Sequence, residues 1–114
     1  MEIYVKLFDK KFNVNVTNKV FRETMLAQKA FAEMNNTAGK SDAEIFDTSI
    51  AANKQAVNYL KDTLKLTKKQ TDALDNMDFD ETMSTANYVC YRAMGMSDEQ
   101  IEAEKEKVAE DPKK

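Results

Sequence analysis

The first sixteen residues alternate apolar and polar side chains with a period of two, which is the period of a half-buried strand. Residues 2–8 and residues 12–16 each place their apolar side chains on one face, and Asp9-Lys10-Lys11 lies between them as a turn. This predicts an N-terminal β-hairpin over residues 2–16, packed on the following helices because an isolated hairpin is marginal in water. Its apolar positions are Ile3, Val5, Leu7, Phe12, Val14 and Val16.

From Thr17 onward the apolar spacing becomes helical and predicts helices over residues 17–35, 42–65, 68–77, 80–94 and 98–109. Ser41, Thr67 and Ser97 each stand three residues before Glu or Gln, which is the spacing of a capping box at a helix start. Two glycines and one proline are too few for the turns of an all-β fold. We expect a mainly α single domain of about five helices over residues 1–110, with residues 111–114 as a disordered tail.

The helix predicted over residues 42–65 carries a run with spacings of 4, 3, 4, 3 and 4 residues, which resembles the seam of a coiled coil. One interpretation is a helix packed on the core of its own domain. The other is self-association through this seam, in which Asn53 would help to set the register between two chains. Three heptads do not decide between the two interpretations. The seam residues are Phe46, Ile50, Asn53, Val57, Leu60 and Leu64.

The helix predicted over residues 80–94 is apolar nearly all round, as in a central helix or a helix with a second, intermolecular face. Four of the six internal methionines lie between residues 77 and 96. Unbranched thioether side chains can fill gaps in a core, and they also suit a groove that accepts helices of varied sequence. We take five apolar residues as candidates for binding a partner: Phe79, Met83, Val89, Met94 and Met96.

The amino-acid composition excludes most kinds of catalytic site. The chain has no histidine and one cysteine, which excludes a disulfide framework within the chain, clustered Cys/His zinc sites and histidine acid–base catalysis. Carboxylates cluster from Asp75 to Glu81, but they lack the spacing of a calcium loop and fit helix capping better. Cys90, between Val89 and Tyr91, is typical of a small buried apolar side chain. The sequence therefore predicts a protein that is not an enzyme and that needs no cofactor or metal.

Charge and hydropathy limit the partners. The net charge is −3, and residues 72–91 contain five carboxylates and no basic side chain, which would repel a phosphate backbone. A helix-turn-helix over residues 67–94 would present acidic side chains where a DNA reader needs basic ones, so we expect no nucleic-acid partner. The chain has neither a run of eighteen apolar residues nor the apolar stretch of a signal peptide, so we expect a cytoplasmic protein without a membrane partner.

Three segments carry a resemblance to a known family: MEIYVKLF at residues 1–8, DFDETM at 78–83 and RAMGMSDEQI at 92–101, followed by a Lys/Glu-rich tail. Together with the small acidic chain and the order of hairpin and helices, they resemble the tail assembly chaperones of long-tailed phages of Gram-positive bacteria, particularly lactococcal siphophages. The resemblance covers essentially the whole chain. It carries no catalytic residue.

The resemblance implies a non-structural protein, absent from the finished virion, that binds the tape measure protein and keeps it soluble until the tail tube polymerises around it. It also implies self-association into a homo-oligomer. A second function remains open on the sequence, that of a structural head–tail connector or tail-completion protein of the virion. A third is a small regulatory DNA-binding protein, against which the charge pattern argues.

Overall fold

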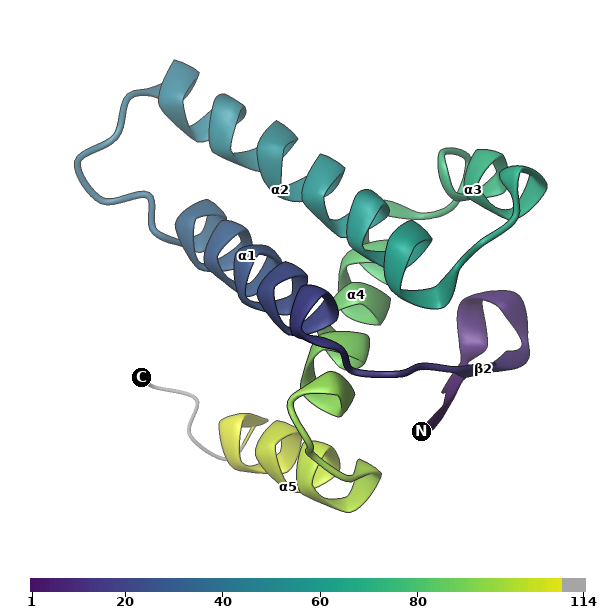
Figure 1. The fold of residues 1–114 in the computed structure, drawn as a ribbon. Helices are drawn as coiled ribbons and strands as arrows, with labels where there is room; N and C mark the ends of the chain where they lie inside the picture. The colour runs from purple at the N-terminus through teal and green to yellow at the C-terminus, as the bar shows by residue number, and fades with distance from the viewer. Residues whose placement is uncertain (110–114) are drawn as a thin grey trace.

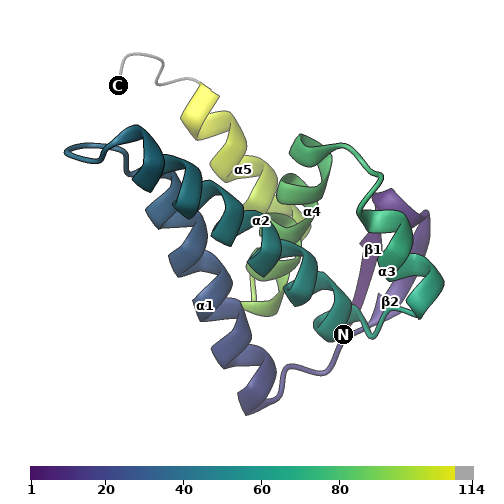
Figure 2. The same ribbon diagram turned by 90° about the horizontal axis from the view of Figure 1, so that it is seen from above.

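The computed structural model describes residues 1–109, and the side chains of residues 1–106 within them. The tail predicted for residues 111–114 lies outside the described residues. Helices α1 (Asn18–Asn35) and α2 (Asp42–Leu64) run side by side as an antiparallel pair, and α4 (Phe79–Ala93) crosses them (Figures 1 and 2). A short helix α3 (Lys68–Leu74), a final helix α5 (Asp98–Ala109) and a two-stranded hairpin complete the fold. The predicted mainly α fold with an N-terminal β-hairpin is confirmed.

The hairpin is shorter than predicted, and its turn lies elsewhere. Strands β1 (Glu2–Val5) and β2 (Lys10–Asn13) pair antiparallel, with Ile3 opposite Phe12. The turn is a 3₁₀ helix, η1 (Lys6–Phe8), closed by Asp9 in the left-handed conformation, so the turn expected at residues 9–11 is wrong by about three positions. The sequence pattern does not reveal this 3₁₀ turn, because Leu7 continues the period of two of Ile3 and Val5. The buried face consists of Ile3, Val5, Phe12 and Val14.

The α1–α2 pair is held by small side chains at close range. Ala27, Ala52 and Ala56 are fully buried, and alanine lets two helix backbones approach closely. Next to them the hydroxyl oxygens of Thr24 and Tyr59 lie 2.8 Å apart. The single Thr24 proton goes to the Val20 carbonyl at 2.8 Å, so Tyr59 donates to Thr24. A buried phenol is thereby satisfied within the interface.

Local signals set the helix starts to within one residue of the prediction, with α1 beginning at residue 18 instead of 17. Thr17 caps α1, and Ser41 and Thr67 form complete capping boxes with Glu44 and Gln70. Asp78 accepts from the backbone N–H of Glu81, so α4 begins at residue 79 rather than 80. The ends are less well predicted: α2 stops at residue 64 instead of 65, α3 at 74 instead of 77, and α4 at 93 instead of 94.

Helix α4 is the centre of the domain. It contacts α1 and α2 on one side and the hairpin and α5 on others, as Figure 1 shows. Its buried residues are Thr82, Ala86, Val89 and Cys90. The sequence left two interpretations of this helix, a central helix or a helix with a second, intermolecular face, and the structure shows a central helix. Most of its apolar surface packs against its own domain.

Candidate functional site

Exposed apolar side chains are the candidate functional feature of this chain. Phe46 and Ile50 on α2 are 64% and 55% exposed, and Phe79 at the start of α4 is 48% exposed. On α1, Phe21 and Leu26 are also about half exposed. Single exposed apolar side chains are ordinary, whereas a group of them on one face indicates an interaction surface.

The five residues predicted to bind a partner do not form one surface. Phe79 and Met94 are exposed, Met83 and Met96 are half-buried, and Val89 is fully buried. Val89 faces the core because it lies one turn after Ala86 and directly before Cys90 on the packed side of α4, so it cannot contact a partner in the folded chain. The inclusion of Val89 in that set is therefore corrected.

The remaining four residues point into different surroundings. Met83 lines a depression between α1 and α4 together with Phe31, Met34 and Tyr91. Met94 and Met96 lie at the turn between α4 and α5, fifteen or more residues from Phe79, which corresponds to about 22 Å along a helix axis. Met83 and Phe79 are one turn apart in sequence, but they line separate depressions.

The predicted self-association seam on α2 is divided by the chain's own fold. Leu60 and Leu64 are buried in the domain core, and Val57 is half-buried against it. Only Phe46 and Ile50, in the first half of α2, stay exposed. In this fold Leu60 and Leu64 are not accessible to a second chain, because the domain itself buries them.

One depression brings the two predicted sets together. Asn53 and Val57 of α2 line it with Met77 and Phe79, at the point where α3 leads into α4. Ile50 lies one helical turn before Asn53 on α2, and Phe46 lies a further turn away on the same face. We call these residues the α2–α4 surface: Phe46, Ile50, Asn53, Val57, Met77 and Phe79. Sequence reasoning placed its members other than Met77 in two separate sets, but nothing in their spacing shows that Phe79 lies beside α2.

A comparison with known protein families decides the relationship. A family model of phage tail assembly chaperone proteins matches residues 1–109. The chain belongs to this family. The match is to the family as a whole and does not distinguish the lactococcal type. No curated protein and no solved structure significantly matches the chain.

The buried hydroxyl of Tyr59 and the buried thiol of Cys90 lie in the packed core of this tail assembly chaperone. Burial raises the pKa of the Tyr59 hydroxyl and, likewise, the pKa of the Cys90 thiol. A fully buried thiol with a raised pKa carries little thiolate, the form that acts as a nucleophile.

Within the residues that the structure describes, no group of three acidic or cysteine side chains could hold a metal ion. None of the described helices is both long and apolar enough to span a bilayer.

One polar cluster fixes α5 of the tail assembly chaperone to α4. Asp98 accepts from the Tyr88 hydroxyl at 2.6 Å and from the Arg92 guanidinium at 3.2 Å. Arg92 also donates to the carbonyl oxygen of Glu2 at 3.3 Å, so a single side chain links the hairpin, α4 and α5. In α5 the side chain of Ile101 is buried, whereas the side chains of residues 102–106 are exposed. The cluster is therefore a main anchor of α5.

We expect Arg92→Ala to loosen α5 with a modest effect on the whole domain. Its partner Asp98 is largely exposed, so solvent screening limits the loss to about 1 kcal/mol. Amide hydrogen exchange should show faster exchange across α5, while α1 and α2 keep their protection. As a matched control, Lys105→Ala removes an exposed pair with Glu102 and should leave exchange in the rest of the domain unchanged. Equal protection of α5 in Arg92→Ala and the wild type would contradict this anchoring role.

Proposed function

We propose that this tail assembly chaperone binds the tape measure protein of its phage and keeps that long helical protein soluble until the tail tube forms around it. The observation that carries the proposal is the exposed apolar surface on α2 and α4 of a chain that belongs to the family. Apolar faces of amphipathic helices are recognised by exposed apolar grooves of this kind. The chain acts by binding and not by catalysis.

Several copies would coat one tape measure protein in the host cytoplasm. Each contact is small, so the affinity of one copy is moderate and the stability of the complex comes from many copies along the same chain. Growing tube protein could then displace the copies one by one. A chaperone that leaves in this way is absent from the finished virion.

Co-expression with an otherwise insoluble fragment of the tape measure protein from the same genome tests this function. We expect soluble complexes that contain several copies of this chain, measured by pull-down and by light scattering after size-exclusion chromatography. The control is an equally insoluble helical fragment of an unrelated protein, which should stay in the pellet. An insoluble tape measure fragment together with detection of this chain in purified virions would overturn the proposal in favour of a structural component.

A further inference from the structure

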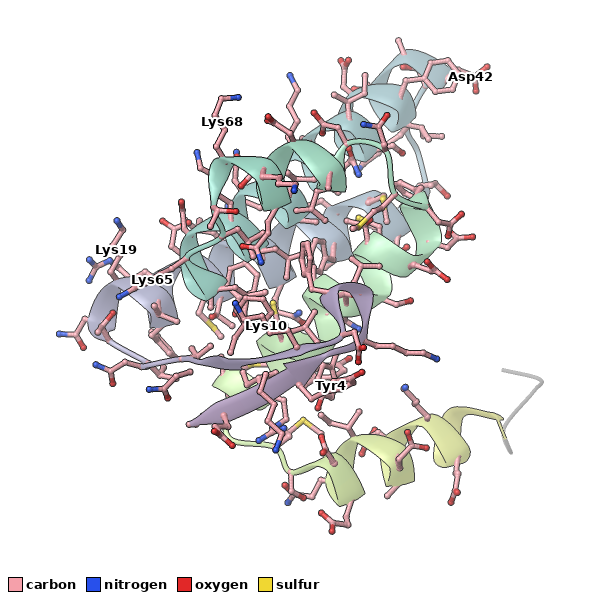
Figure 3. All side chains as sticks on the ribbon, turned by 90° about the vertical axis from the view of Figure 1, so that its right-hand side faces the viewer. Tyr4, Lys10, Lys19, Asp42, Lys65 and Lys68 are labelled. Carbon is pink, nitrogen blue, oxygen red and sulfur yellow. The ribbon has the colours of Figure 1, made fainter. Side chains whose placement is uncertain are left out.

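Carboxylates border the apolar α2–α4 surface. On α2, Asp42 and Asp47 flank Phe46, and Figure 3 shows Asp42 at the end of α2 farthest from Lys65. Asp75 lines the depression beside Asn53 and Phe79. Asp78, directly before Phe79, is exposed as well.

Within the described side chains, no ion pair neutralises these carboxylates. The ion pairs within residues 1–106 use other side chains. The first basic residue on α2 is Lys54, one turn beyond Ile50, and the segment from Asp75 to Tyr91 has none. The first turn of α2 holds two acidic residues, Asp42 and Glu44, and the partial positive charge at this end of the helix dipole compensates them only in part. A partner that covers the apolar side chains therefore meets several exposed carboxylates on the border, with Lys54 as the exposed basic side chain of α2 beside Asn53.

We propose that the α2–α4 surface takes an amphipathic helix whose apolar stripe is flanked by lysine or arginine side chains. The apolar stripe would cover Phe46, Ile50 and Phe79, and its basic flanks would face Asp42, Asp47 and Asp75. Opposite charges at the rim of an interface select partners and speed association, whereas like charges reject them. A second copy that docked the same surface in two-fold symmetry would bring these carboxylates together, which disfavours it as the occupant. The inference rests on the proposed function, because we expect such helices in the tape measure protein.

The test uses two synthetic peptides of about 18 residues, long enough for about 27 Å of helix. Both carry the same leucine stripe, and they differ only in lysine or glutamate flanks. Measured by fluorescence anisotropy with the full chain, the lysine peptide should bind at least about tenfold more tightly than the glutamate peptide. The difference should shrink as ionic strength rises, because salt screens exposed charges. Equal binding of the two peptides would overturn the charge preference.

Paired variants locate the site. Phe46→Ala with Ile50→Ala should weaken binding of the lysine peptide about tenfold and leave the fold intact, because both side chains are more than half exposed and alanine favours helix. Phe21→Ala with Leu26→Ala removes a similar exposed apolar area from α1 and should change binding less than twofold. Equal losses in the two variants would overturn the assignment to α2 and α4. If sedimentation showed that the first variant abolishes self-association of the wild type, the occupant would be a second copy and the inference would be wrong.

Failure of this inference is distinguishable from failure of the proposed function. If the Phe46→Ala, Ile50→Ala variant still solubilises the tape measure fragment as well as the wild type, the function stands and this surface is not its site. If the fragment stays insoluble while the lysine peptide binds at α2–α4, the surface is supported and its natural partner is another basic amphipathic helix.

Discussion

Tyr59→Ala is expected to destabilise the domain by about 3–5 kcal/mol, the range for removing a fully buried aromatic side chain. Tyr59 has no exposed surface and lies in the core between α1 and α2, so its removal leaves a cavity there. Small domains are stable by only about 5–15 kcal/mol, so the variant should be partly unfolded at 37 °C. Urea denaturation followed by circular dichroism measures the loss directly.

Two controls separate the ring of Tyr59 from its hydroxyl and from the helix. Tyr59→Phe removes only the hydrogen bond to Thr24 and should cost about 1 kcal/mol, since Thr24 keeps its bond to the Val20 carbonyl. Asn58→Ala, at the neighbouring exposed position of α2, should change stability by less than about 0.5 kcal/mol. A cost for Tyr59→Ala no larger than that of Tyr59→Phe would contradict the packed ring.

Ile3→Ala is expected to cost about 2–5 kcal/mol, although it lies near the chain terminus. Ile3 has no exposed surface and belongs to the core cluster that includes residues of α1, α2 and α4. The hairpin therefore packs on its own chain and is a part of the core rather than an appendage. Thermal unfolding should show a lower midpoint for the variant at every protein concentration, because the lost contacts are within one chain.

Lys11→Ala is the matched control for Ile3→Ala. Lys11 lies on β2 with an exposed side chain, so its removal should shift the midpoint little. A destabilisation by Ile3→Ala that vanished at high protein concentration would show that the hairpin packs between subunits, contrary to the structure.

Much of the fold follows from local signals. The capping boxes at Ser41 and Thr67 mark helix starts to the residue, because the bonds that form them lie within four residues of sequence. The period of two in residues 2–16 correctly indicated a hairpin. Its turn was misplaced because a 3₁₀ turn that contains Leu7 and Phe8 looks like strand in an apolar pattern, and Asp9 adopts a positive φ that is usual for glycine.

Patterns within the chain specify the helical class, the helix starts to within a residue, the family resemblance and the apolar residues from which any binding surface must be built. Which of these apolar residues stay exposed depends on the packing of the helices against one another. Val89 and Leu60 carry the same apolar signal as Phe79 and Ile50, yet the first two are buried and the last two are exposed. Periodicity identifies the apolar face of a helix. How much of that face a neighbouring helix covers depends on where the two helices cross. Here α4 packs on α2 so that Ile50 stays exposed, and Phe79 lines a depression with Asn53 and Val57.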